Sequence, residues 1–140
     1  MKKIIPVSLV AVFCTMLFLA SCTKEDNTQN APTNADPRAS FVGNWHVSEN
    51  SKDYGTSTYN VTNTDSSDAS HILIAYLYGF NKKTYATISG STLSIPQQII
   101  QGNKISGSGT LVNDTHLNLS YLVQTTTTHY DTVSATLVKF

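Results

Sequence analysis

The chain has 140 residues, of which 13% are charged and 40% are hydrophobic, and its nine basic side chains equal its nine acidic ones in number. This length can bury one modest core, and the charge balance lacks the basic excess that nucleic acid binding requires. The two cysteines, Cys14 and Cys22, both precede the region expected to fold, which excludes disulfides and cysteine-ligated metals from that region.

The first 22 residues have the order of a secretory signal. Lys2 and Lys3 precede an apolar stretch from Ile4 to Leu19, and the segment Leu19-Ala20-Ser21-Cys22 places small residues before a cysteine. A membrane span needs about 20 apolar residues, so this stretch is too short to remain as an anchor. The segment resembles bacterial lipoprotein signals. The resemblance implies that residues 1–21 are removed and that the cysteine carries lipid such as palmitate.

The residues after the cysteine are polar and have no apolar periodicity. We therefore expect the acylated cysteine and a flexible tether over 22–37, followed by one domain over 38–140. Lys24, Glu25 and Asp26 resemble the export signal of Bacteroidota surface lipoproteins. That resemblance implies an outer membrane lipoprotein exposed at the cell surface, held to the membrane by its lipid. A plain solvated start of a tether is the alternative interpretation.

The domain is predicted to be all-β. Short apolar and polar alternations are separated by Gly, Asn and Asp, and no stretch has convincing helical periodicity. Eight or nine short strands are expected, at 44–49, 57–63, 71–78, 84–89, 92–95, 97–101, 104–112, 116–124 and 128–139. Ser89-Gly90, Gly102-Asn103 and Asn113-Asp114 are predicted as tight hairpin turns. An antiparallel meander of this kind hides its apolar face by closing into a small barrel.

Two segments depart from simple alternation. The stretch from His71 to Tyr78 is apolar on both faces, so either a loop covers it or it exposes Ile72, Ile74 and Tyr76 to a partner. Gly107 and Gly109 fall on one face of a strand, which predicts either a sharp bend in the barrel or the close approach of another backbone or a ligand.

The segment Gly43-Asn44-Trp45 resembles the opening of lipocalins and other calycins, where a Gly-x-Trp motif leads into the first strand. The resemblance implies that Trp45 closes one end of the barrel and that a basic residue of the last strand packs across its indole. Lys139 occupies that place, and strand parity directs its stem inward, where the ammonium group can make a cation–π contact.

A second resemblance covers the whole domain. The segments Phe41–Asn50, Ile88–Pro96 and Gln101–Leu111 are similar to small lipocalin-like lipoproteins of Bacteroidota. This resemblance implies a lipocalin-like barrel and a surface location, and it implies no chemistry.

We find no constellation of residues that predicts catalysis, a metal site or a cofactor. Glu49 and Asp53 are interpreted as solvated turn carboxylates, and Gly107-Ser108-Gly109 lacks the spacing of a nucleophile elbow. The histidines are expected to lie singly on the surfaces or rims of four different strands, at His46, His71, His116 and His129. The sequence therefore predicts a protein that is not an enzyme.

Asp131-Thr132-Val133 resembles the acceptor for O-linked glycans in Bacteroidota. The resemblance implies modification of Thr132. The alternative is that this threonine is an outward-facing residue of a strand, where β-branched side chains are favoured.

Two classes of function remain open. The first is a surface-tethered module that binds a small apolar ligand or a glycan through tyrosine rings, for which Tyr59, Tyr76, Tyr78 and Tyr121 are the candidate residues. The second is a protein-interaction module, such as a subunit of a surface complex or a hydrolase inhibitor. An open cavity in the barrel favours the first class, whereas an interior filled by side chains favours the second.

Overall fold

The computed structural model describes residues 36–140. The predicted signal peptide, the lipidated Cys22 and the export signal at Lys24, Glu25 and Asp26 lie outside these residues. In the described part of the chain, no helix has the length and apolar character that a membrane span requires.

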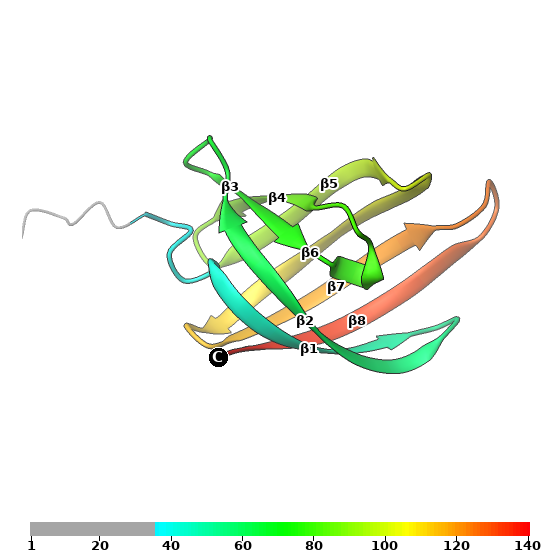
Figure 1. Cartoon of the computed structure of the whole chain (residues 1–140), viewed down its shortest axis with the longest axis horizontal. Helices are drawn as coiled ribbons and strands as arrows, with labels where there is room; N and C mark the ends of the chain where they lie inside the picture. Colours follow the sequence, from blue (N-terminus) through cyan, green and yellow to red (C-terminus); the bar gives the residue numbers. More distant parts are fainter. Residues whose placement is uncertain (1–35) are drawn as a thin grey trace, which may run out of the picture. The chain divides into compact units, whose positions relative to one another are not determined.

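Eight antiparallel strands form a closed barrel in which each strand pairs with the next one in the chain and the last pairs with the first (Figure 1). The strands are β1 (Gly43–Ser51), β2 (Gly55–Asp65), β3 (His71–Ala75), β4 (Thr84–Ser89), β5 (Thr92–Ile100), β6 (Asn103–Asn113), β7 (His116–Gln124) and β8 (Tyr130–Lys139). A short 3₁₀ turn, η1 (Leu77–Gly79), follows β3. The predicted all-β meander closing into a barrel is confirmed.

The two strands predicted on either side of Pro96 are one strand, β5. Its pairing with β6 shifts in register between Ile95 and Gln98, because a proline has no N–H group to donate to a ladder. The amide of Gln98 restores contact with β4 by accepting a hydrogen bond from the Tyr85 amide at 2.9 Å and donating one to its carbonyl at 2.7 Å. The Gln98 side chain thus takes the place of the backbone ladder with β4, whose last pair is Thr87 and Ser94.

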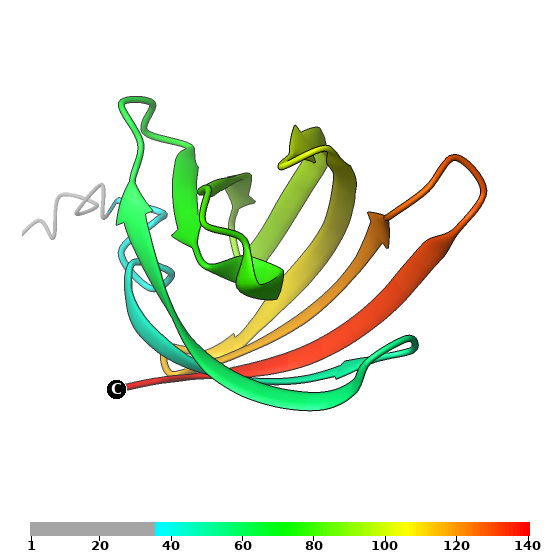
Figure 2. The ribbon, with the colours of Figure 1, turned by 45° about the vertical axis from the view of Figure 1, so that its right-hand side comes forward.

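The stretch from His71 to Tyr78, which is apolar on both faces, is a strand only as far as Ala75, and the chain then turns toward the inside of the barrel. Tyr76 and Tyr78 have left-handed backbone angles, with φ of 65° and 56°, and the buried Leu77 lies between them. Figure 2 shows the connection between β3 and β4, which contains η1, on the inner side of the curved sheet. The interpretation that the stretch exposes Ile72 and Ile74 is wrong, because both are fully buried in the core.

The turns follow the predictions only in part. Gly90 has a positive φ of 56°, as a tight hairpin requires. At the next hairpin the positive φ values belong to Gln101 and Gly102, one position earlier than predicted. Asn113 makes its turn without a positive φ, because its side-chain oxygen accepts a hydrogen bond from the Thr115 amide at 2.9 Å.

Gly107 lies where β6 and β7 approach too closely for a side chain. A Cβ atom at this position would lie 2.4 Å from Cβ of Tyr121 and 2.5 Å from the carbonyl oxygen of Ser120. The sequence predicts two roles for Gly107 and Gly109, a sharp bend or the close approach of another backbone or a ligand. At Gly107 the structure shows the close approach of another backbone.

Inward-facing side chains fill most of the barrel. The largest of the fully buried ones are Trp45, Tyr121, Phe41, Ile72, Ile74, Leu77, Leu93, Ile95, Ile105, Leu117, Leu137 and Val47. The end near Trp45 is closed: its indole N–H donates to the Phe41 carbonyl at 2.9 Å, and Nζ of Lys139 lies 5.4 Å from the ring centroid. A Cβ atom at Gly43, where φ is 130°, would lie 2.9 Å from Cε of Lys139. Within the barrel, the closed end near Trp45 directs attention to the opposite end.

Candidate functional site at the barrel mouth

A cavity of about 430 Å³ lies at the end of the barrel opposite Trp45. Strand β1 carries its alternate residues inward as far as Ser51, and the turn between β1 and β2, β2 itself and η1 supply the rest of the wall. The lining residues are Glu49, Ser51, Tyr54, Ser57, Tyr59, Tyr78 and Gly79. The site therefore combines three tyrosine rings with short hydroxyl side chains and one carboxylate.

The carboxylate of Glu49 is the polar centre of this wall. Its side chain shares the inward face of β1 with Trp45 and Val47, and the residue is only 7% exposed. Oε2 accepts hydrogen bonds from the hydroxyls of Tyr59 and Tyr121, each at 2.6 Å, and Oε1 accepts one from Ser57 at 3.0 Å. The interpretation of Glu49 as a solvated turn residue is wrong.

The two tyrosines act as hydrogen-bond donors at any physiological pH. Burial, followed by the hydrogen bond to Glu49, raises the pKa of Tyr59 well above its ordinary value of 10. Burial, the neighbouring Tyr59 and the bond to Glu49 raise the pKa of Tyr121 still further. The Tyr59 hydroxyl also accepts a hydrogen bond from the backbone amide of Tyr78 at 3.0 Å, so it connects the carboxylate to η1.

Asp131, at the start of β8, forms a second buried carboxylate centre behind the wall. It accepts hydrogen bonds from the Ser51 hydroxyl at 2.6 Å, the Tyr78 hydroxyl at 2.7 Å and the Asp53 amide at 3.2 Å. Burial raises the pKa of Asp131, but the bonds from Ser51, Tyr78 and backbone amides outweigh this effect and leave the pKa lowered, so the carboxylate is ionised. Asp131 thereby holds β1, η1 and β8 together.

The ring of Tyr78 is the centre of an aromatic cluster at the mouth. The centroids of Tyr54 and Tyr121 lie 6.2 Å and 6.1 Å from it in edge-to-face arrangements, and that of Phe80 lies 5.4 Å away. Such pairs contribute about 0.5–1.5 kcal/mol each beyond the area that they bury. These contacts and the two hydrogen bonds of Tyr78 offset the strain of its left-handed backbone.

The structure brings three of the four candidate tyrosines together. Tyr59 and Tyr78 line the cavity. Tyr121 does not line it, but its hydroxyl donates a hydrogen bond to Glu49 in the cavity wall. Tyr76 is 57% exposed and is not part of the cavity wall. Leu117, Leu119 and Leu137 are buried within the barrel rather than arranged around an open space, so the cavity is a shallow cup above a filled interior.

Sequence reasoning missed the buried carboxylates, although strand parity carries the signal. Glu49 alternates with Trp45 and Val47, and Asp131 alternates with Val133 and Ala135, so both positions face inward. Thr132, next to Asp131, faces outward and is exposed.

The carboxylates of Glu49 and Asp131 have no cationic partner in the described part of the chain. The ion pairs within residues 36–140 are Arg38–Asp36, Arg38–Asp65, His71–Asp68 and His129–Asp53. His129 lies in the loop before β8 and not on a strand as predicted. Over the same residues, no three His, Cys, Asp or Glu side chains gather in a way that could hold a metal ion.

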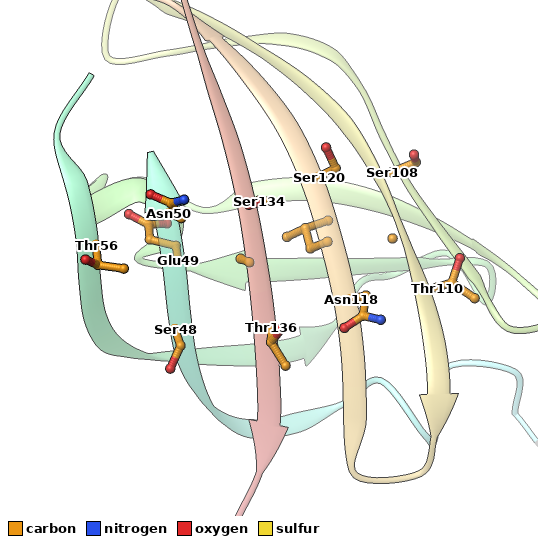
Figure 3. Close-up of a pocket in the computed structure, with 13 residues that line it drawn as sticks. Ser48, Glu49, Asn50, Thr56, Ser108, Thr110, Asn118, Ser120, Ser134 and Thr136 are labelled. Atoms are coloured by element: carbon orange, nitrogen blue, oxygen red, sulfur yellow. The ribbon is translucent and has the colours of Figure 1, made fainter. Parts of the chain in front are cut away.

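A second hollow, of about 560 Å³, lies on the outer surface over β6, β7, β8 and β1 (Figure 3). Two rows of short neutral side chains cross these strands. One row contains Ser108, Ser120, Ser134 and Asn50, and the other contains Thr110, Asn118, Thr136 and Ser48. This hollow is larger than the mouth cavity, but it has no aromatic ring and no outward charge. We therefore favour the mouth, where rings and a buried carboxylate converge.

Comparison with known proteins supports the fold. No protein-family model matches the chain, and no curated protein matches it. Solved structures that resemble it include three small barrels, and each of these matches covers nearly the whole of the other chain. EF1p2_mFAP2b bound to DFHBI is 17% identical over 75% of this chain and 99% of the other, with a TM-score of 0.56. The redesigned β-barrel b11L5F_LGL is 15% identical over 74% and 96%, with a TM-score of 0.54. The redesigned β-barrel mFAP1 bound to DFHBI is 19% identical over 73% and 99%, with a TM-score of 0.53. At these identities the likeness concerns the lipocalin-like barrel fold alone.

Proposed function

We propose that this protein is a surface-tethered lipoprotein whose barrel binds a small ligand at its mouth, without catalysing a reaction. The observation that carries the proposal is the cavity of about 430 Å³ in which tyrosine rings surround a buried, hydrogen-bonded carboxylate. Small-molecule sites are typically clefts of about 300–1,000 Å³ with apolar walls and a few convergent polar groups. The mouth cavity has this size and this composition.

Two further observations support a ligand at this end of the barrel. Two of the similar barrels are described as bound to DFHBI, so barrels of this fold can hold a small molecule. In addition, Tyr78 is held in a left-handed conformation at the cavity wall. Such strain tends to occur where a protein preorganises a ligand site.

The hydrogen bonds at the mouth favour binding over catalysis. Glu49 accepts three hydroxyl hydrogen bonds, and Asp131 is held by Ser51, Tyr78 and a backbone amide. A general base must instead be free to take a proton from a substrate. Asp131 therefore serves to position hydroxyl groups, and Glu49 uses most of its acceptor positions in the same way.

A protein-interaction module is the second candidate, and the filled interior below the cup favours it. Tyr54 is 75% exposed and Tyr76 is 57% exposed, so two large rings meet solvent near the mouth. Exposed aromatic side chains commonly anchor protein interfaces.

A dye-binding experiment tests the small-ligand proposal. Ser57 lines the cavity, whereas Thr58, the next residue of β2, lies outside it and is exposed. We expect Ser57→Trp to fill the cup and reduce the affinity for the neutral fluorescent dye N-phenyl-1-naphthylamine, while Thr58→Trp leaves it unchanged. Equal binding by both variants, or no binding by the parent protein, would contradict the proposal. In the latter case the interaction module becomes the better interpretation.

The tether is tested separately. If Cys22 carries lipid, Cys22→Ala should move the protein from the membrane fraction to the soluble fraction, and metabolic labelling with a fatty acid should be lost. If the cluster at Lys24, Glu25 and Asp26 directs export, protease added to intact cells should remove the protein. Removal only after the outer membrane is broken would leave a lipoprotein that faces the periplasm.

A further inference from the structure

The charge balance inside the mouth is one-sided. Glu49 is 7% exposed and Asp131 is fully buried, and neither belongs to an ion pair within residues 36–140. Lys52 and Lys82, lysines of the loops that join β1 to β2 and β3 to β4, are exposed, and Lys83 directs its ammonium group to the hydroxyl of Thr64. A buried carboxylate without a cationic partner is costly even when hydroxyl groups solvate it. The wall of the cup therefore has a negative charge that no cation within residues 36–140 matches.

The hydrogen bonds of Glu49 leave room for one more donor. A carboxylate has about four acceptor positions. Oε2 uses two of them for Tyr59 and Tyr121, whereas Oε1 receives a single bond, from Ser57. Glu49 and Ser57 both line the cavity. The remaining acceptor position therefore belongs to Oε1, beside Ser57 in the cavity wall.

The aromatic walls add a second attraction of the same sign. Tyr54, Tyr59 and Tyr78 line the cavity around Glu49. The faces of aromatic rings attract cations, most strongly where water is excluded, and ring-lined cages are a recurring way of binding ammonium groups. An anionic ligand would be repelled both by the carboxylate and by the negative faces of the rings.

We propose that the ligand taken at the barrel mouth is an organic ammonium compound, with its N–H group on Oε1 of Glu49 and its apolar body against the rings of Tyr54, Tyr59 and Tyr78. This inference rests on the proposed function, because it specifies the class of ligand that the same cavity takes. Glu49 and the three rings contact the ligand. Asp131 is a positioning residue that orients Tyr78 and Ser51.

Three probes of similar size separate charge from shape. They are 2-phenylethylammonium, 2-phenylethanol and 3-phenylpropionate, each titrated by calorimetry into the purified full-length protein at 0.15 M salt. The ammonium compound should bind about tenfold to a hundredfold more tightly than the alcohol, because both can donate a hydrogen bond to the carboxylate but only the ammonium group also brings an opposite charge. The propionate should bind most weakly.

Substitution at Glu49 tests the residue that the inference names. Glu49→Gln should bring the affinities for the ammonium compound and the alcohol to within about threefold of each other. Asp53→Asn is the matched control, because it removes a negative charge near the mouth from a residue that does not line the cavity, and it should keep the preference. Circular dichroism establishes that each variant is folded, and the comparison of probes on the parent protein stands without any variant.

The outcomes distinguish this inference from the proposed function. If the alcohol or the propionate binds as tightly as the ammonium compound, or if the dye binds and the ammonium compound does not, the inference is overturned and the small-ligand site remains. Retention of the ammonium preference in a folded Glu49→Gln variant overturns it as well. If neither the dye nor any of the three probes binds, the inference and the proposed function fail together.

Discussion

Replacement of Trp45 by alanine should be among the most damaging single changes in this barrel. The side chain is fully buried, and truncation of a buried tryptophan typically costs about 3–5 kcal/mol of unfolding free energy through lost burial and the cavity left behind. The lost hydrogen bond adds little, because the Phe41 carbonyl keeps a second donor, the side-chain amide of Asn63 at 3.0 Å. We therefore expect a loss of about 3–5 kcal/mol.

Lys139→Met is the matched comparison, since it keeps an unbranched stem over the indole and removes the ammonium group with its charge and its hydrogen bonds. Nζ of Lys139 lies 5.4 Å from the ring centroid and donates to the Ser40 carbonyl at 3.2 Å. A cation–π contact at a partly exposed site contributes about 0.5–1 kcal/mol, so the variant should lose about that much. The contrast distinguishes a buried plug from a surface contact.

Urea denaturation followed by far-ultraviolet circular dichroism is the suitable assay. Tryptophan fluorescence cannot compare the variants, because Trp45 is the single tryptophan of the chain. If Trp45→Ala does not fold, Trp45→Phe keeps most of the buried volume and measures the same site. A loss in Trp45→Ala below that in Lys139→Met would refute the reasoning that the indole closes the barrel.

Two further predictions concern other parts of the barrel. Asp131 has a folded-state pKa below its ordinary value of 3.8, so it stabilises the fold above about pH 4 and loses this contribution as the pH falls through the folded pKa. The free energy of unfolding, measured from pH 6 to pH 2, should therefore decline less steeply in Asp131→Asn than in the parent protein. Parallel profiles of the two proteins would contradict this assignment. Gly107→Ala should cost at least about 1–3 kcal/mol, because the added Cβ meets Cβ of Tyr121 at 2.4 Å. The exposed Ser108→Ala on the same strand should change stability by less than about 0.5 kcal/mol, and similar losses in the two variants would show that the close approach of β7 does not constrain this position.

The fold follows from local patterns that a sequence displays directly. The segment His116–Gln124 alternates apolar and polar residues without interruption, and it forms β7 with the predicted bounds. Where a backbone donor is missing, local pattern is a weaker guide. Pro96 divides the predicted strand in two, but the chain continues as β5 because Gln98–Ile100 pair again with β6, while the Gln98 side chain bridges to β4. That compensation depends on a partner strand and is invisible in the segment itself.

The left-handed turn after β3 could not have been predicted from its own residues. Tyrosine rarely adopts positive φ, and the sequence around Tyr78 favours an extended strand. The turn is held by groups distant in the sequence, since the Tyr78 hydroxyl donates to Asp131 and its amide donates to the Tyr59 hydroxyl. A local preference was overridden by tertiary hydrogen bonds. The ends of strands in a closed barrel are where such overrides are expected, because the backbone ladder no longer fixes the chain there.

The buried carboxylates raise a different difficulty. The alternation of residues along their strands places Glu49 and Asp131 inside the barrel. Acidic residues are almost never fully buried without partners, so the residue type predicts that both are exposed. The conflict is resolved by hydroxyl groups, since Tyr59, Tyr121 and Ser57 solvate Glu49 in place of water. At the open end of this barrel, the alternation of residues along the strand correctly predicts that both carboxylates face inward, although their residue type predicts exposure. Such a conflict points to the position of the candidate site. A core selected for stability alone would carry an apolar residue at Glu49, and the carboxylate there is what the proposed ammonium site requires.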